Sequence, residues 1–119
     1  LASFPGDGVI TAPPTGATAY SLAAGGPIVE PTAENLIVTP VCAHSLHAKP
    51  FVLHSTRVVG VRIAPGCRKT AWLSVDGGKA FRVQPGDWVE CRRSQQVTQL
   101  IRLTGRSFYE RIHQKLGRI

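Results

Sequence analysis

The sequence predicts a mainly β protein, an antiparallel β-sandwich of many short strands with one short N-terminal helix and one C-terminal helix. From residue 35 onward, short β-prone runs follow at roughly even spacing, and several alternate apolar with polar side chains. Turn dipeptides such as Pro65-Gly66 and Asp76-Gly77 separate these runs. With 119 residues, 43% of them hydrophobic, we expect one domain, residues 1–119, with its own core.

The first forty residues are rich in Gly, Ala, Pro and Thr. Residues 9–12 form a short β-prone run that ends at Pro13-Pro14. Residues 18–24 are good helix formers, and Gly25-Gly26-Pro27 is a plausible C-terminal stop for that helix. The turn at residues 14–16 would present the first backbone N–H groups of the helix to a polar or anionic ligand. Taken alone, this Gly-rich turn is only a weak indication of a ligand site.

The rest of the chain is predicted to be strands followed by one helix. The β-prone runs after the first are residues 36–39, 51–53, 58–63, 70–75, 80–83, 88–93 and 99–103. Trp72 and Trp88 lie in alternating runs, so we expect both rings in the core. In the closing helix, Ser107 and Glu110 form a capping-box pair and Gly117 ends it. One apolar face of this helix would pack on the sheet: Phe108, Ile112 and Leu116.

The positive charge of the chain is unevenly placed. Residues 1–40 contain three acidic and no basic side chains, whereas residues 41–119 contain all 14 basic side chains and four acidic ones. Such a block can attract nucleic acid or another phosphate-bearing ligand, or simply solvate one face of a sheet. The basic residues alternate with apolar ones, which favours the solvated face. A nucleic-acid-binding β-barrel stays open as an alternative, but we expect no nucleic-acid partner.

The cysteines carry no metal or redox motif. Cys42, Cys67 and Cys91 are widely spaced, and no C-x-x-C occurs. His44 and His47 lie near Cys42, but no second ligand pair follows, so we expect no metal site. An odd number of cysteines without secretory features indicates reduced, buried thiols and a cytoplasmic protein. No apolar run approaches the ~18 residues of a membrane span, so no membrane partner is expected.

The start of the chain is unusual for a complete translation product. The sequence contains no Met and opens with Leu1-Ala2-Ser3. Because Leu is a poor residue to expose by removal of an initiator Met, we expect the chain to be part of a longer protein.

Several motifs resemble those of one enzyme family. The run GDGVITAPPTGATAYSLAAGGPIV at residues 6–29 closely resembles the motif of bacterial NAD kinases, in which GDG and two hydrophobic residues precede PTGSTAYSLSAGGPIV. Residues 36–46, LIVTPVCAHSL, resemble that family's L-x-x-TPICPHSL, and residues 74–77 resemble its V-D-G turn. Residues 107–116 are similar to its closing Phe-Tyr and basic helix. The resemblance therefore extends over essentially the whole chain.

The resemblance implies an activity and its partners. NAD kinases phosphorylate the adenosine 2′-hydroxyl of NAD to give NADP, with ATP and a divalent metal, Mg, or with polyphosphate as the donor. Residues 1–119 would then be the C-terminal NAD-binding β-sandwich domain, without the N-terminal α/β domain of the family. Because a neighbouring subunit supplies part of each site in this family, a homodimer or homotetramer is implied.

The resemblance also implies site residues. Asp7 would hydrogen-bond the dinucleotide. Six successive residues would line the nucleotide: Thr18, Ala19, Tyr20, Ser21, Leu22 and Ala23. Without the resemblance, Asp7 would be a plain turn residue and Tyr20 a core aromatic, and His44 is expected to be structural.

The chain departs from the family pattern at several points. Ala17 and Ala23 stand where the family usually has Ser, and Gly78 stands where many members have Gln. The family's Gly-Gly-Asp-Gly motif, whose aspartate acts on the reacting hydroxyl, would lie upstream of Leu1 together with its Asn-Glu/Asp motif. No catalytic residue is therefore assigned here, and residues 1–119 alone are predicted to be inactive.

One rival enzyme shares that upstream motif. Lipid kinases of the sphingosine or diacylglycerol type carry Gly-Gly-Asp-Gly as well. The run TAYSLAAGGP at residues 18–27 argues against this rival, because such kinases accommodate an acyl chain there.

Overall fold

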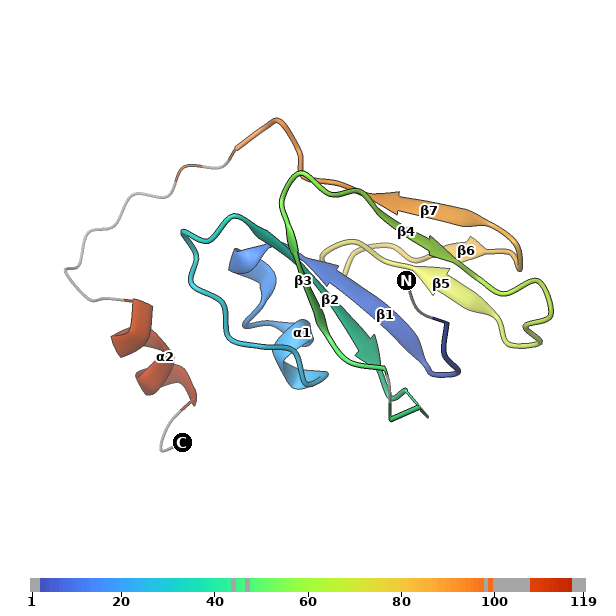
Figure 1. The fold of residues 1–119 in the computed structure, drawn as a ribbon, viewed down its shortest axis with the longest axis horizontal. Coiled ribbons are helices and arrows are strands. Elements are labelled where there is room, and N and C mark those ends of the chain that lie inside the picture. Colours follow the sequence, from blue (N-terminus) through green and yellow to red (C-terminus); the bar gives the residue numbers. More distant parts are fainter. Residues whose placement is uncertain (1–2, 44, 47, 98, 100–107, 117–119) are drawn as a thin grey trace. The chain divides into compact units, whose positions relative to one another are not determined.

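The computed structural model describes residues 3–43, 45, 46, 48–97, 99 and 108–116 (Figure 1). The chain divides into two compact units, one of Leu1–Ser55 with Arg93–Ile119 and one of Thr56–Arg92. The first unit holds a three-stranded sheet, and the second holds two two-stranded sheets. Every strand pair is antiparallel, so the predicted mainly β class with antiparallel sheets and two α-helices is confirmed. The packing of these sheets into a sandwich stays a prediction.

The sheet of the first unit is built around its middle strand. Its strands, in the order β1-β2-β3, are Gly8–Ala12, Asn35–Val41 and Phe51–His54. β2 is buried at four of its seven residues, because it is paired on both sides and also covered by the segment that follows β1. Pairing with β3 ends at Val38, two residues before Pro40. Since proline has no N–H to donate, only β1 accompanies β2 beyond that point.

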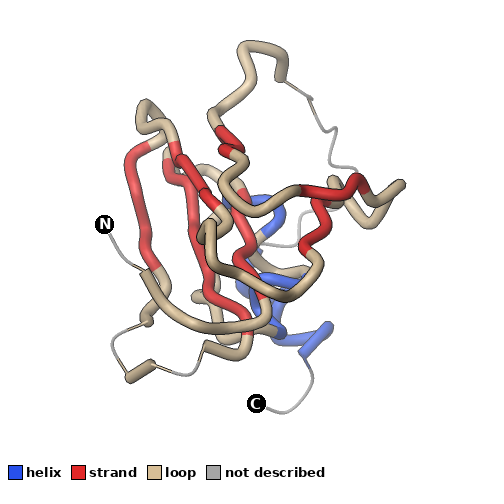
Figure 2. Tube along the Cα trace, turned by 90° about the vertical axis from the view of Figure 1, so that its right-hand side faces the viewer, coloured by secondary structure: helices blue, strands red, loops and turns tan. Residues whose placement is uncertain are grey.

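The helical segment after β1 lies against this sheet (Figure 2). It consists of the 3-10 turn η1, Pro14–Gly16, and the helix α1, Tyr20–Ala23. Ala17, Val29 and Ile37 form the buried cluster beneath it. The structure thus confirms a short N-terminal helix. It covers Tyr20–Ala23, about one turn less than the predicted residues 18–24.

The predicted stop of α1 is a hydrogen-bonded glycine cap. Gly25 has a φ of 95° and donates its N–H to the Leu22 carbonyl at 3.0 Å. Gly26 donates to the Ser21 carbonyl at 2.8 Å. These two bonds form the Schellman arrangement, which favours glycine at the position with positive φ. The Gly-Gly pair therefore ends the helix for the reason that the sequence predicted.

The second unit consists of two strand pairs. β4 pairs with β7 and β5 with β6; their bounds are Val59–Arg62, Trp88–Cys91, Ala71–Leu73 and Phe81–Val83. Asp76 and Gly77 connect β5 to β6 with φ of 52° and 69°, while Gly78 donates to the Val75 carbonyl at 2.9 Å. Two central residues with positive φ define a type I′ turn, for which Asp-Gly is a preferred pair. The predicted hairpin turn is therefore confirmed.

The expectation that both tryptophans lie in the core is wrong. Trp72 is 62% exposed and Trp88 is 60% exposed. For Trp88 the reason is register, because it lies opposite Arg62 on the face of the β4–β7 pair away from buried Val59. Trp72 lies opposite Arg82 in the β5–β6 pair, in which no residue is buried. The strand of Trp88 alternates as predicted, but its indole ring lies on the outward face.

The thiols are also less buried than expected. Cys42 is exposed with a φ of 48°, and Cys67 and Cys91 are half-buried. All three are free. Cys42 follows the last residue of β2, where the chain leaves the sheet, and this explains its exposure.

The C-terminal helix α2 spans Phe108–Leu116. Phe108 and Tyr109 contact each other edge to face, with ring centroids 5.3 Å apart. Ser107 and Gly117, its predicted ends, lie outside the described residues, as does the strand predicted at residues 99–103 apart from Gln99. The packing of this helix on a sheet stays a prediction. Among the described residues, no helix has the length and apolar character needed to cross a bilayer.

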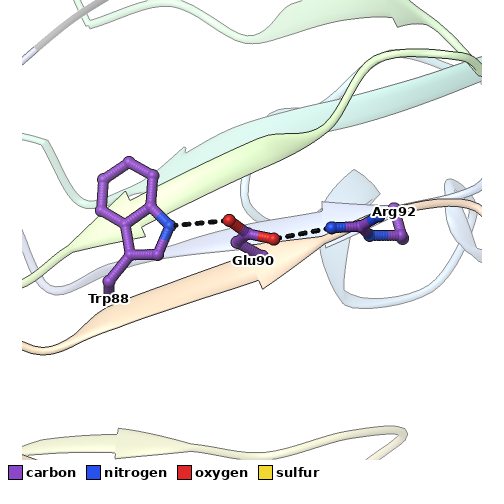
Figure 3. A network of polar contacts seen from close by, with 3 residues as sticks. All are labelled: Trp88, Glu90 and Arg92. Atoms are coloured by element: carbon purple, nitrogen blue, oxygen red, sulfur yellow. Dashed lines mark hydrogen bonds and ion pairs between the residues drawn. The ribbon is translucent and has the colours of Figure 1, made fainter.

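A polar chain runs along the outer face of β7. Trp88 donates its Nε1–H to Glu90 Oε1 at 3.2 Å, and Arg92 Nη2 lies 2.7 Å from Glu90 Oε2 (Figure 3). The Trp88 ring lies over Gly60, where any Cβ would overlap it. Hydrogen bonds from Trp88 and then Arg92 favour the carboxylate and lower the pKa of Glu90.

We predict that Trp88→Phe raises the pKa of Glu90 toward its ordinary value, because the ring stays while the N–H donor is lost. Carboxyl titration by NMR measures this directly. Trp72→Phe is the matched control, since Trp72 lies on β5, and it should leave the Glu90 pKa unchanged. Because the folded-state pKa is lowered, this network stabilises the fold above the unfolded pKa, and the contribution disappears as pH falls through the folded value. An unaltered Glu90 pKa in Trp88→Phe would contradict the assignment.

Candidate functional site

The first motif, residues 6–29, begins with Gly6 and Asp7, which lie beside the last residue of β2, Val41. Asp7 donates its backbone N–H to the Val41 carbonyl at 2.9 Å, one step beyond the β1–β2 ladder. A Cβ at Gly6 would lie 3.1 Å from Ala43 Cα and 3.2 Å from the Val41 oxygen. Glycine thus permits the close approach of the two segments. The Asp7 side chain is exposed, so its carboxylate is available to a ligand.

The first motif is joined to β2 again through α1. Ser21 Oγ lies 2.9 Å from Thr39 Oγ1, and either hydroxyl can donate. Ser21 is 1% exposed and Thr39 is 0% exposed. A Cβ at Gly26 would lie 2.5 Å from Ser21 Oγ and 2.7 Å from Thr39 Oγ1, so this position too accepts only glycine without a shift.

These two attachments bring the predicted site residues to one stretch of the sheet. Thr39 and Val41 are two residues apart on β2, a span of about 7 Å along a strand. Thr39 anchors α1 and Val41 anchors Asp7. In the sequence, Asp7 and α1 lie on either side of the five-residue strand β1. In the fold, the chain turns back after β1, so that α1 contacts this strand.

The exposure of the six predicted lining residues differs sharply. Thr18, Ala19, Tyr20 and Ala23 are exposed, with Tyr20 at 65%. Tyr20 is therefore not a core aromatic, which was its default interpretation as an isolated residue. Leu22 is half-buried. The Ser21 hydroxyl is directed into the protein, toward Thr39.

The sequence predicted that the turn at residues 14–16 presents the first backbone N–H groups of the helix to a ligand; some N–H groups of this segment are already used within it. Several N–H groups donate to backbone carbonyls within residues 13–19: those of Gly16, Ala17, Ala19, Leu22 and Ala23. The tight succession of η1 and α1 causes this, because each turn satisfies the donors that an isolated helix start would leave unpaired. This segment therefore presents to solvent mainly the side chains of its exposed residues, more than backbone N–H groups.

Sequence reasoning missed the part played by Thr39 and Gly26. Both lie inside the quoted motifs, yet Thr39 was given no role and Gly26 was assigned only to the helix stop, not to the contact with the two hydroxyls. A signal existed for Thr39, since it is a hydroxyl-bearing residue in the otherwise apolar run LIVTPV, and a buried polar side chain requires a partner. The identity of that partner, 18 positions earlier, is a tertiary fact.

Metal-ligating side chains are dispersed over the described part of the chain. No three His, Cys, Asp or Glu residues among those described come together as a metal site requires. His44 and His47 lie outside the described residues. The arrangement thus offers an exposed carboxylate, an exposed hydroxyl and an exposed aromatic ring, which suit recognition of a ligand with polar edges and flat rings.

Comparison with known proteins identifies the family. The family model for the ATP-NAD kinase C-terminal domain matches residues 1–103. The chain belongs to the NAD kinase family. The NAD kinase of Symbiobacterium thermophilum is 44% identical over 117 residues, covering 98% of this chain and 41% of that protein. The NAD kinase of Methanosarcina acetivorans is 38% identical over 111 residues, covering 93% and 40%.

A solved structure agrees with this assignment. The crystal structure of yeast NADH kinase complexed with NADH matches with a TM-score of 0.61 at 38% identity, covering 76% of this chain and 25% of that one. The chain spans about two fifths of the length of the curated NAD kinases it matches. Membership of the NAD kinase family favours this assignment over a lipid kinase domain and over a nucleic-acid-binding β-barrel.

We predict that Gly26→Ala destabilises this NAD kinase domain by ~1–3 kcal/mol, because the added methyl group overlaps the Ser21 and Thr39 hydroxyls. Urea unfolding measures the change. Gly8→Ala is the control: it lies in β1, and a Cβ there meets nothing within 4 Å. Equal loss of stability in both variants would show that the close approach at Gly26 is not the cause.

Proposed function

We propose that this chain is the dinucleotide-binding part of an NAD kinase, which phosphorylates the adenosine 2′-hydroxyl of NAD to give NADP. The observation that carries the proposal is the fold of residues 6–29, where Asp7 and Tyr20 are exposed and the segment bearing them is attached to β2 at both ends. The relatives named NAD kinase, and the yeast NADH kinase complexed with NADH, support it.

Each exposed residue has a role that its chemistry allows. The Asp7 carboxylate accepts a hydrogen bond from an amide or amino group of the dinucleotide. The Tyr20 ring offers a face against which a base or nicotinamide ring stacks. Thr18 contributes a hydroxyl, and Ala19 and Ala23 contribute small surfaces that allow the ligand to approach closely. Leu22 and Ser21 support these residues from beneath.

Phosphoryl transfer requires groups that residues 1–119 do not offer. The donor, ATP or polyphosphate, needs neutralisation of its charge, which a divalent metal such as Mg supplies with ATP. The Gly-Gly-Asp-Gly motif of the family does not occur in this sequence. Asp76 occupies a type I′ turn, and Asp87 Oδ2 accepts the Gln84 backbone N–H at 2.7 Å. Both carboxylates therefore belong to turns, and we assign the catalytic acid to neither.

Assembly and location complete the proposal. We propose a homodimer or homotetramer in which a second subunit contributes to each dinucleotide site, and a cytoplasmic protein. Light scattering on the purified protein measures the mass of the assembly. A nucleic-acid partner is not proposed, although Trp88 opposite Arg62 and Trp72 opposite Arg82 are exposed aromatic–arginine pairs, the kind of residues that such a partner contacts.

We predict that Asp7→Asn weakens NAD binding by about 1–3 kcal/mol and leaves the fold intact, because a hydrogen bond to a charged acceptor is lost in an exposed turn. Calorimetric titration of NAD and NADH measures the affinity. Asp76→Asn is the control, since Asn suits the positive φ of that turn and the residue lies in the other unit. Equal NAD affinity of Asp7→Asn and the parent would remove Asp7 from the site.

We predict no NADP formation by residues 1–119 alone in the presence of NAD, ATP and magnesium. The physical reason is that binding one substrate does not position the donor or handle the nucleophile. A coupled assay for NADP measures this, and calorimetry on the same sample confirms that NAD is bound. Joining the domain that carries Gly-Gly-Asp-Gly in the same chain should restore activity. NADP production above background by the 119 residues would place a catalytic group within them.

A further inference from the structure

We propose that Thr39 is a positioning residue for the dinucleotide site. Through its hydrogen bond to Ser21 it holds α1 on β2, and thereby sets where Tyr20 and Thr18 are displayed. Thr39 itself is fully buried, so it acts through Ser21 and not through its own surface. The inference rests on the proposed function for its link to NAD, whereas the link from Thr39 to Tyr20 is a property of the chain alone.

The first step is that α1 depends on a tertiary anchor. The helix has four residues, Tyr20–Ala23, and neither of its ends is capped by a side chain. A single turn of helix is unstable in water, because its nucleation cost exceeds what so few hydrogen bonds return. Ser21 is the one buried residue of this helix. The attachment at Ser21 therefore decides how α1 is oriented.

The second step is that the attachment of α1 consists of two buried hydroxyl groups, each of which requires a hydrogen-bond partner. Two hydroxyl groups are buried side by side, 2.9 Å apart, at 1% and 0% exposure. Among the described residues, no buried side-chain nitrogen or oxygen lacks a hydrogen-bond partner. Removing the Thr39 hydroxyl would leave that of Ser21 without this partner in a buried position, where an unpaired polar group is costly.

The third step is that the residues around Ser21 leave little space for its hydroxyl to find another hydrogen-bond partner. Gly26 packs against both hydroxyls, and its N–H donates to the Ser21 carbonyl at 2.8 Å. The main chain on either side of Ser21 is thus confined. An unpaired Ser21 hydroxyl is relieved most simply by lifting α1 toward solvent.

The last step connects the anchor to the exposed ring. Consecutive residues of a helix are rotated by about 100° around its axis, so an inward Ser21 directs its neighbour Tyr20 outward. Tyr20 is 65% exposed, in agreement with this geometry. A change in the orientation of α1 must therefore move Tyr20, even though Thr39 lies on another element.

The alternative is that Thr39 contributes to stability only, and two substitutions separate these cases. Thr39→Val keeps the shape and removes the hydroxyl; Thr39→Ser keeps the hydroxyl and removes a methyl group. Val59→Ala, at a buried residue of the other unit, is a control that lowers stability without touching α1. All three variants are compared with the parent chain by urea unfolding, NAD calorimetry and NMR of the Tyr20 ring.

We expect Thr39→Val to weaken NAD binding about tenfold, because α1 displaced by the unpaired hydroxyl must return to its parental orientation when NAD binds, at a cost comparable to that of the unpaired group. The Tyr20 ring resonances should shift in the ligand-free protein. Thr39→Ser should keep parental affinity and Tyr20 resonances, even where its stability falls, and Val59→Ala should do the same. If Thr39→Val does not fold, Ser21→Ala tests the same bond from the other side with the same expected result.

Parental affinity and unshifted Tyr20 resonances in Thr39→Val would overturn the positioning role. So would an equal loss of affinity in Thr39→Ser or Val59→Ala, since stability would then explain it. If the parent chain binds neither NAD nor NADH, the proposed function fails by itself. In that case the Tyr20 ring resonances still test the role of Thr39: a shift in Thr39→Val but not in Thr39→Ser supports it, and no shift in Thr39→Val contradicts it.

Discussion

The hydrogen bond between Ser21 and Thr39 is the interaction on which the geometry of the candidate site depends. It joins a one-turn helix, which cannot hold its own shape, to β2, the strand with the most buried residues among those that the structure describes. Ile37 and Leu36 make β2 a rigid support, because their side chains are fully or almost fully enclosed. The exposed residues of α1 are therefore positioned by a pair of buried hydroxyl groups. Polar groups buried in pairs are well suited to this purpose, since only one arrangement satisfies both.

The sequence was most informative where local chemistry decides the structure. The Gly25-Gly26 stop and the Asp76-Gly77 turn were predicted correctly, because positive φ and tight turns select specific residue types. The strands predicted at residues 58–63, 70–75, 80–83 and 88–93 were also found, with each predicted bound at the observed one or up to two residues beyond it. Alternation of apolar and polar residues is a property of the strand itself. These predictions needed no knowledge of what each strand faces.

The errors arose where the answer depends on distant residues. Alternation indicated two faces for the strand of Trp88 but not which face is covered, and that ring lies outward over Gly60. The pairing of Thr39 with Ser21 was invisible for a similar reason. The site residues themselves came from the resemblance to NAD kinases, not from physical reasoning, since Asp7 between two glycines looks like any turn. What the fold adds is that Asp7 and Tyr20 are exposed and attached to the same strand.

The outward-facing indoles have a consequence for how the molecule can be observed. Trp72 and Trp88 are the only tryptophans of the chain, and both lie in the unit Thr56–Arg92. Their intrinsic emission therefore reports the solvent contact of that unit alone, without a background from the core. Anything that covers these rings, whether another domain or another subunit, will move the emission to shorter wavelength and protect it from soluble quenchers. The protein thus carries an internal optical probe for the burial of this unit.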